Sequence, residues 1–301
     1  MKILVLGSSG QLGKSLKKSL IRLNDEIKFL NKDELSLENF YEVNKLLNNK
    51  PFNIVINTAA YTKVDKSEQN TEKAFLLNHL AVKNLSQTCF KLGILLVHFS
   101  TDYVFDGKSK KPYKENYATS AIGCYGNSKL KGEESIINSK CNYIIIRTSW
   151  LYSEYGENFL KTILNLILKK DLDRKLYVVN DQIGRPTCAN NLANATRYIL
   201  QEINLNQSIN QIFHFCGDKI CSWYDFANEI YQVAKDLKLD VKNKPHPIST
   251  VDYDNLTKTD SYYRPMYSVL DKNKFDKKFN FNHEDLSESI LRNIKNLYKL
   301  K

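Results

Sequence analysis

The strongest constraint on the fold of this chain is a glycine-rich segment close to its N-terminus. Residues 3–6 are apolar, and the run Gly7-Ser8-Ser9-Gly10-Gln11-Leu12-Gly13 follows them directly. Leucines then recur at helical spacing, at positions 12, 16, 20 and 23. A strand, a tight turn and a helix in this order allow close backbone approach to a pyrophosphate, whose charge is favourable at a helix N-terminus. The segment therefore predicts a dinucleotide-binding loop, with a purely structural glycine turn as the alternative.

Apolar segments then alternate between strand-like and helix-like patterns as far as residue 150. Further strands are expected at residues 27–30, 54–56, 94–99 and 143–146, and helices at residues 40–47, 74–85 and 125–137. Strands that alternate with helices predict a parallel sheet covered by helices on both faces. We therefore expect an α/β fold built on a Rossmann-type, doubly wound parallel sheet.

The rhythm changes after Trp150, which indicates a second unit. Helices are expected at residues 159–168, 226–237 and 286–297 and strands at 176–179 and 212–215, whereas residues 239–283 are polar with few clear elements. We expect residues 1–150 to form a dinucleotide-binding Rossmann domain, rejoined by about residues 188–217. Residues 151–301 are expected to form mainly a smaller C-terminal α/β substrate domain.

The net charge of the chain bears on its class of partner. A formal charge of +11 raises the question of nucleic-acid binding. The lysines are spread along the sequence, however, and no dense run of Lys and Arg is interleaved with aromatic residues. An excess of positive charge equally suits a small substrate that carries phosphate. We therefore expect no nucleic-acid partner.

Cysteine usage and hydropathy indicate the compartment. The six cysteines include no C-x-x-C pair and no zinc-ligand spacing, which favours a reducing cytosol and predicts no metal site. No apolar run reaches the ~18 residues that a membrane span requires, and residues 3–6 are too short for a secretory signal. The sequence thus indicates a cytoplasmic protein with no membrane partner. It leaves open whether a divalent cation such as Mg is needed.

A second motif joins a tyrosine to a lysine four residues later. Tyr125 and Lys129 share one face if residues 125–137 are helical. A lysine ammonium close to a phenol stabilises the phenolate, so that the tyrosine can exchange a proton near neutral pH. This chemistry suits ketone reduction, in which a nicotinamide gives a hydride and the tyrosine protonates the new alkoxide. In a lysine-rich chain the same pattern also arises in a surface helix.

Thr101 gives the tyrosine motif its context. It follows the strand expected at residues 94–99, and ligands of open α/β sheets bind at the carboxyl ends of the strands. A hydroxyl there can hydrogen-bond a substrate carbonyl. The glycine loop, Thr101 and the tyrosine–lysine pair come in this order, each at the appropriate element, which favours an enzyme. By contrast, His98 within the strand is expected to be a hydrogen-bonded core histidine.

The loop after the second strand bears on the choice of cofactor. An acidic residue there commonly binds the adenosine ribose, and Asp33 and Glu34 occupy that position. Lys32 beside them offers a partner for a 2′-phosphate instead. For each of the three, a solvated charged loop is an equal alternative. We expect either NADPH or NADH to serve as the cofactor.

These motifs and several longer stretches resemble the extended short-chain dehydrogenases/reductases that act on nucleotide sugars. The resemblance runs from residue 1 to about residue 275. The stretches that carry it are NTAAYTKVD (57–65), STDYVFDG (100–107), RTSW (147–150), VNDQIG (179–184), SWYDF (222–226) and RP (264–265).

The resemblance implies a role for individual residues. The catalytic triad would be Thr101, Tyr125 and Lys129. The pyrophosphate would be held by Gly7, Gly10, Gln11, Leu12 and Gly13. The ribose and nicotinamide side of the cofactor would be lined by Ala59, Ala60 and Tyr61. The sugar would contact Tyr103 and Trp150, and the nucleotide-sugar cleft would be lined by Asn158, Gln182 and Arg264. A core position at the domain hinge is the alternative for Trp150, and Trp223 is expected to be a packing residue.

The resemblance also implies a reaction. A monomer or homodimer would reduce the C4 ketone of dTDP-4-dehydro-L-rhamnose with NADPH or NADH, giving dTDP-L-rhamnose for cell-surface polysaccharide. Two alternatives stay open. One is another nucleotide-sugar 4-reductase or epimerase of the same family, and the other is a non-catalytic, dinucleotide-binding regulatory relative. The intact triad favours an enzyme over the second.

Overall fold

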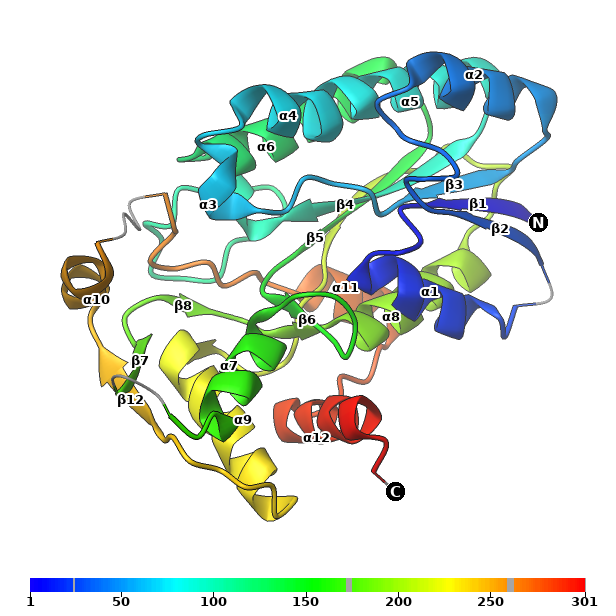
Figure 1. The fold of residues 1–301 in the computed structure, drawn as a ribbon. Helices are drawn as coiled ribbons and strands as arrows, with labels where there is room; N and C mark the ends of the chain where they lie inside the picture. Colours follow the sequence, from blue (N-terminus) through cyan, green and yellow to red (C-terminus); the bar gives the residue numbers. More distant parts are fainter. Residues whose placement is uncertain (24, 172–174, 259–262, 301) are drawn as a thin grey trace.

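Six parallel strands form the central sheet of the protein (Figure 1). The structure is a computed structural model that describes residues 1–23, 25–171, 175–258 and 263–300. The strands are β1 (Lys2–Leu6), β2 (Glu26–Leu30), β3 (Ile54–Asn57), β4 (Leu95–Thr101), β5 (Tyr143–Thr148) and β10 (Asn210–His214), in the spatial order β10-β5-β4-β3-β1-β2. The parallel Rossmann-type sheet expected from the sequence is therefore confirmed.

Helices cover both faces of this sheet (Figure 1). One face carries α1 (Gln11–Leu20), α8 (Ala189–Glu202) and α11 (Asn273–Phe279), and the other carries α2 (Phe40–Asn49), α3 (Val64–Ser67), α4 (Thr71–Phe75), α5 (Ala81–Leu92) and α6 (Cys124–Ser139). Successive residues of β1 alternate between the two cores: Ile3 and Val5 face α1, while Leu4 and Leu6 face α2 and α5. Burial on both faces explains why the strands read as continuous apolar runs.

The helix expected at residues 74–85 is interrupted in the structure. Between α4 and α5 lies one π-helical turn, η1 (Leu76–Leu80). π-turns are rare and occur frequently at functional sites. This one contains Asn78, which is buried and bonds to the neighbouring segment at Tyr61.

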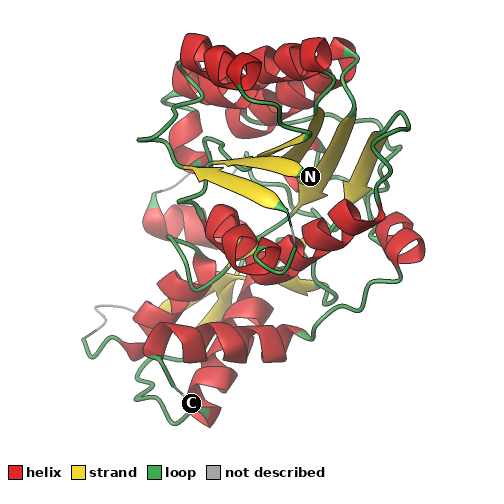
Figure 2. Ribbon diagram, turned by 90° about the vertical axis from the view of Figure 1, so that its right-hand side faces the viewer, coloured by secondary structure: helices red, strands yellow, loops and turns green. Residues whose placement is uncertain are grey.

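The C-terminal part has short strands and helices of its own, which lie beneath the sheet in Figure 2. Its elements are β6 (Leu151–Tyr152), α7 (Phe159–Leu168), β7 (Leu176–Val179), β8 (Ile183–Gly184), β9 (Thr187–Cys188), β11 (Cys221–Ser222), α9 (Trp223–Asp236), β12 (Pro245–Ile248), α10 (Thr250–Thr257) and α12 (Leu286–Tyr298). The expectation that residues 239–283 hold few elements was wrong, because β12, α10 and α11 lie there. The strand β12 contains two prolines and pairs with β7 at the edge of a two-stranded sheet, a pattern that sequence periodicity does not detect.

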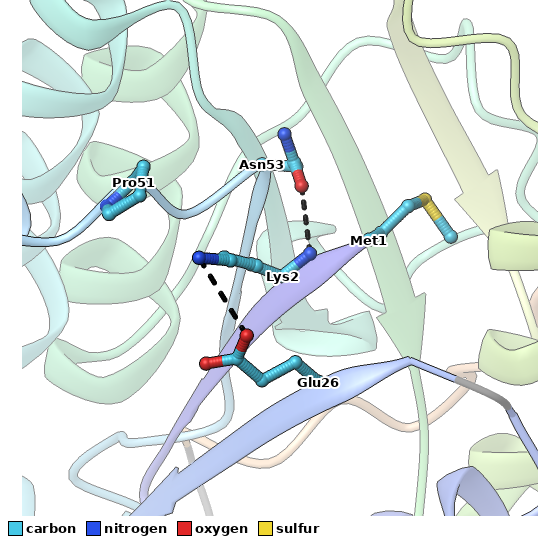
Figure 3. Close-up of a pocket in the computed structure, with 5 residues that line it drawn as sticks. All are labelled: Met1, Lys2, Glu26, Pro51 and Asn53. Atoms are coloured by element: carbon cyan, nitrogen blue, oxygen red, sulfur yellow. Dashed lines mark hydrogen bonds and ion pairs between the residues drawn. The ribbon is translucent and has the colours of Figure 1, made fainter.

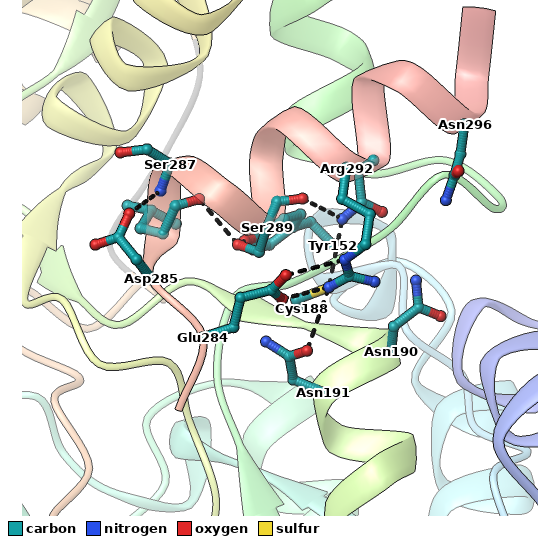
Figure 4. Close-up of polar contacts among 12 residues, drawn as sticks. Tyr152, Cys188, Asn190, Asn191, Glu284, Asp285, Ser287, Ser289, Arg292 and Asn296 are labelled. Carbon is teal, nitrogen blue, oxygen red and sulfur yellow. Dashed lines mark hydrogen bonds and ion pairs between the residues drawn. The ribbon is translucent and has the colours of Figure 1, made fainter. Parts of the chain in front are cut away.

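Polar contacts attach the last helix to the rest of the protein (Figure 4). The guanidinium of Arg292 on α12 pairs with Glu284 and donates to Asn191 Oδ1 on α8 at 3.2 Å. Tyr152 shares a hydrogen bond with Ser289 of α12. The apolar faces of α7, α9 and α12 form a separate core below the sheet. None of the described helices is long and apolar enough to cross a membrane.

A buried ion pair ties α6 to the central sheet. Arg147 of β5 donates through Nε to Glu133 Oε1 at 3.0 Å and through Nη2 to Glu133 Oε2 at 2.6 Å. The two side chains are only 4% and 1% exposed. Removing one partner of such a pair leaves a buried charge without its counter-ion. The pair therefore holds α6, which carries Tyr125 and Lys129, against β5.

We predict that Glu133→Gln lowers the free energy of unfolding by ~3–5 kcal/mol, the usual cost of breaking a buried pair. The matched control is Glu134→Gln on the same helix, because the pair between Glu134 and Lys131 is largely exposed. That control should cost less than ~1 kcal/mol. Denaturant unfolding of both variants measures the difference, and equal losses would contradict a structural role for the buried pair.

Candidate active site

The glycine loop leaves β1 and turns directly into α1. Gly7 has a positive φ of 79°, and a Cβ there would lie 2.6 Å from the backbone nitrogen of Ala59. A Cβ on Gly13 would lie 2.5 Å from the carbonyl oxygen of Gly7. Both positions therefore require glycine, the first for backbone conformation and close approach and the second for close packing. Gly10 is the N-cap of α1, so the free N–H groups of the helix begin at Gln11 and Leu12.

The loop after β2 lies beside the glycine loop, since the Ser8 N–H donates to the Leu30 carbonyl. Its carboxylate at Glu34 accepts the Asn31 N–H at 2.8 Å, and the Asn31 side chain accepts the N–H groups of Asp33 and Glu34. Lys32 forms an exposed pair with Glu38 at 3.7 Å. In this arrangement Glu34 stabilises its own loop, while Asp33 has an exposed side chain. Asn31 was not identified from the sequence.

The segment after β3 runs between the glycine loop and α6. The Thr58 hydroxyl donates to the Leu6 carbonyl at 2.7 Å, which places Ala59 and Ala60 next to the loop. Tyr61 is held at both backbone groups by Asn78 of the π-turn, and the same amide donates to Ser128 Oγ on α6 at 3.0 Å. Sequence reasoning missed Asn78, and a lone amide on an apolar helix face was the available signal.

Tyr125 lies half-buried where α6 meets the end of β4. Thr101, the last residue of β4, hydrogen-bonds Tyr125, and burial raises the pKa of Tyr125 to about 12 while this hydrogen bond opposes the rise. The Thr101 hydroxyl also donates to Asp102 Oδ1 at 3.0 Å and accepts the N–H of Tyr103 at 3.2 Å. Burial raises the pKa of Asp102 to about 6. The expected pair of Thr101 and Tyr125 is thus brought together.

Lys129 is buried one turn further along α6. Its ammonium donates to the Phe99 carbonyl at 2.6 Å and lies 3.3 Å from His98 Nε2. Burial lowers the pKa of Lys129 to about 8, although Glu133 acts in the opposite direction. The side chain therefore contacts β4, and its pKa is lower than the sequence motif alone implied. His98 is a buried, hydrogen-bonded core histidine as expected, but one of its partners is this lysine.

Tyr103 lies close to both Tyr125 and Arg264. It lies on η2 (Asp102–Val104), and its ring packs edge to face against Tyr125 with centroids 5.4 Å apart. Burial raises the pKa of the Tyr103 phenol, and the nearby charge of Arg264 opposes this rise. Arg264 forms a bidentate pair with Asp65, with both oxygens 2.8 Å from Nη2. The guanidinium of Arg264, the rings of Tyr103 and Tyr125 and the hydroxyl of Thr101 therefore lie next to one another in the site.

A cavity of about 1200 Å³ opens beside Arg264, between α3 and the C-terminal part. Gln182 and Arg264 both line it, together with lysines at 169, 175 and 258. The Gln182 amide is held by Thr250 at the start of α10, at 3.1 Å. Basic side chains around a cavity of this size suit a ligand that carries phosphate.

Trp150 and Trp223 stack with ring centroids 3.6 Å apart and an interplanar angle of 7°. Gly184 lies against the Trp150 indole, since a Cβ there would be 2.4 Å from the ring. Trp223 also lines the cavity. The backbone of Trp150 has a positive φ of 47°. Trp223 is thus a packing residue at the start of α9, as expected, and Trp150 packs against it where the chain passes from β5 into β6.

Asn158 contacts the glycine loop. Its amide donates to Gln11 Oε1 at 2.9 Å, and its oxygen caps α7 by accepting the Lys161 N–H. Ser153 donates to the same Gln11 oxygen at 3.0 Å. Asn158 is absent from the lining of the large cavity among the described residues. The structure therefore places it between the glycine loop and α7, where it joins the two parts of the chain.

A smaller hollow of about 430 Å³ lies at the opposite ends of the strands (Figure 3). Lys2 and Glu26 border it, and Lys2 donates its N–H to Asn53 at 2.7 Å. It shares no lining residue with the site around Tyr125. Within the described part of the chain, no group of three or more His, Cys, Asp or Glu side chains is placed to hold a metal ion.

A glycine loop after β1 and a buried Tyr-x-x-x-Lys helix beside a hydroxyl at the end of β4 define an extended short-chain dehydrogenase/reductase. Comparison with known proteins narrows this class. The model of the RmlD substrate binding domain family matches residues 1–299, and the chain belongs to that family.

Similar proteins cover nearly the whole chain. The dTDP-4-dehydrorhamnose reductase of Aggregatibacter actinomycetemcomitans is 36% identical over 298 residues, 98% of each chain. The crystal structure of a dTDP-4-dehydrorhamnose reductase from Clostridium acetobutylicum has a TM-score of 0.87 at 36% identity, covering 99% of this chain and 100% of that one. The Bacillus anthracis enzyme of the same name, in complex with NADP, has a TM-score of 0.85 at 30% identity, with 98% and 99% covered.

We predict that Gly13→Ala destabilises the protein by about 1–3 kcal/mol, the usual cost of overpacking, because its Cβ would overlap the Gly7 carbonyl. Gly10→Ala is the matched control, since its nearest neighbour would be 3.4 Å away. It should change the free energy of unfolding by less than ~0.5 kcal/mol. Denaturant unfolding compares the two. Equal stability of both variants would show that the loop does not need the close packing at Gly13.

Proposed function

We propose that the protein is an NADPH- or NADH-dependent reductase that converts dTDP-4-dehydro-L-rhamnose to dTDP-L-rhamnose. The observation that carries the proposal is the cluster of buried Thr101 and Lys129 with half-buried Tyr125 at the carboxyl end of β4. Relatives that cover nearly the whole chain bear the name of this reductase. The product would serve cell-surface polysaccharide synthesis. Intact catalytic residues argue against a non-catalytic regulatory role.

The two parts of the chain would divide the work. In this proposal residues 1–150, with about residues 188–217, hold the dinucleotide, and residues 151–301 otherwise hold most of the nucleotide sugar. The N–H groups at Gln11 and Leu12 and the tight turn at Gly7, Gly10 and Gly13 suit a pyrophosphate. Ala59, Ala60 and Tyr61 would line the ribose and nicotinamide. Lys32, Asp33 and Glu34 stand at the adenosine end.

The chain's own residues would manage the proton. When bound, the nicotinamide supplies a hydride to C4 of the sugar. Tyr125 would give its phenolic proton to the oxygen that becomes the hydroxyl, and Thr101 would hydrogen-bond the same oxygen. Lys129 in its ammonium form would stabilise the resulting phenolate. Because burial raises the pKa of Tyr125, the phenol is protonated and ready to donate at neutral pH.

The substrate would lie between Tyr103 and the large cavity. Tyr103 and Trp150 would frame the deoxy sugar, whose missing C6 hydroxyl makes it partly apolar. Gln182 and Arg264 line the cavity, and the planar guanidinium suits diphosphate oxygens. The diphosphate would then compete with Asp65, which holds Arg264 in the structure. Asn158 would support the site from behind, through Gln11.

The direct test is cofactor oxidation with defined sugars, followed by absorbance. We expect turnover with dTDP-4-dehydro-L-rhamnose, using NADPH and NADH with a modest preference between them. The matched substrates are GDP- and UDP-linked 4-keto sugars, which should give little turnover. Turnover with a GDP-linked sugar and none with the dTDP sugar would leave only the reductase class, and favour another nucleotide-sugar reductase of the family.

Tyr125→Phe removes the proton donor and keeps the ring. We predict that turnover falls by at least ~10²-fold, the usual effect of losing a general acid. Binding of NADPH, measured by fluorescence, should be retained. Tyr117→Phe is the control, because Tyr117 is exposed and lies outside the proposed machinery. Near-normal turnover of the Tyr125 variant would rule out its role as proton donor.

A further inference from the structure

His98 lies next to Lys129 in the interior of the protein. It is fully buried in β4, between Asn57 at the end of β3 and Lys129 on α6. Its Nδ1 is 3.2 Å from Asn57 Nδ2, and its Nε2 is 3.3 Å from Lys129 Nζ. Three polar side chains from three elements thus form one line through the core, and the reaction described above uses only the lysine.

The backbone decides how this line is hydrogen-bonded. Asn57 Oδ1 accepts the N–H of Ala59 at 3.1 Å, and a backbone N–H can only donate. The NH₂ group of Asn57 must therefore face His98, so Nδ1 of the ring must accept. A neutral imidazole carries one proton, which is then on Nε2. The ring is neutral near pH 7, because burial and then the charge of Lys129 lower the pKa of His98 well below its usual value.

A proton on Nε2 favours one form of Lys129 over the other. A neutral amine accepts the Nε2–H of His98 and still donates to the Phe99 carbonyl, which is 2.6 Å away. An ammonium has only donors, so it cannot accept the Nε2–H, and two donors then face each other. Hydrogen bonding to the neutral form lowers the pKa of an amine, in the same direction as burial.

We propose that Asn57 and His98 are positioning residues that hold the Lys129 amine in place and favour its neutral form. The catalytic meaning of this arrangement rests on the proposed function, in which the ammonium form of Lys129 assists Tyr125. The lysine then changes charge close to neutral pH instead of near its usual value. The reductase reaction accordingly loses rate as the pH rises through the Lys129 pKa, which lies at about 8.

Other charged groups face Lys129 from the packed elements. Glu133 on its own helix favours the ammonium, but Arg147 of β5 binds that carboxylate. Asp102 hydrogen-bonds Thr101, and its charge raises the pKa of Tyr125. The contacts of β3 and β4 with the amine are therefore the Phe99 carbonyl, which accepts from either form, and the line from Asn57 through His98.

The first test measures the tautomer and needs no turnover. Long-range ¹H–¹⁵N NMR of the whole protein, with His98 assigned by its loss in His98→Phe, should show the proton on Nε2 and none on Nδ1. The His98 ring resonances should also titrate with Lys129, and the midpoint should lie well below the usual pKa of lysine. A proton on Nδ1 would overturn the inference. If the wild-type protein shows the expected tautomer but does not turn over the dTDP sugar, the proposed function is contradicted and the tautomer is not.

The second test uses the pH profile of turnover. His98→Phe removes the donor, so the alkaline limb for sugar reduction should move upward by ~1 pH unit. Asn57→Asp should do the same, because a carboxylate accepts from Nδ1–H and turns Nε2 into an acceptor. His246→Phe is the control and should keep the wild-type profile, since His246 lies on β12. An unchanged limb in folded His98→Phe would mean that the histidine only packs.

Discussion

Burial of Tyr125 and Lys129 against the carboxyl end of β4 is the constraint on which the rest of the site depends. Burial disfavours the charged form of both groups, so it raises the pKa of the phenol and lowers that of the amine. The pKa values of the two groups, which are ordinarily similar, are thereby moved apart. Such groups are tolerated in a core only when they are hydrogen-bonded, and Thr101, Phe99 and His98 provide those bonds.

The surrounding fold keeps these groups in place. Every residue of β4 is buried, and the pair of Arg147 and Glu133 joins α6 to β5. On the other side, Asn78 ties the segment at Tyr61 to α6 through Ser128. The glycine loop is joined to the C-terminal part by Gln11 and its partners. The glycine loop and the C-terminal part are thus connected by side-chain contacts as well as by the chain that passes between them.

Sequence patterns predicted the sheet and the core of the site because both depend on local signals. Apolar runs between helices specify parallel strands, and Tyr125 and Lys129 lie four residues apart on a single helix. Several misses involve contacts between segments that are apart in the sequence. The amide of Asn78 and the bond from His98 to Lys129 each join residues whose proximity only the fold creates. Asn158 was expected in the substrate cleft, and its contact with Gln11 spans 147 positions of the chain. The elements at residues 239–283 were missed because short, proline-containing strands show little periodicity.

The central claim is that the site transfers a hydride to C4 of a dTDP-linked sugar while Tyr125 provides the proton. Its most direct test is a single-turnover reaction with NADPH that carries deuterium at the transferable position of the nicotinamide, followed by NMR of the sugar product. The account predicts one deuterium bound to C4 of dTDP-L-rhamnose and none elsewhere on the sugar. Recovery of the dTDP sugar unreduced, or of product with deuterium at another carbon, would contradict it.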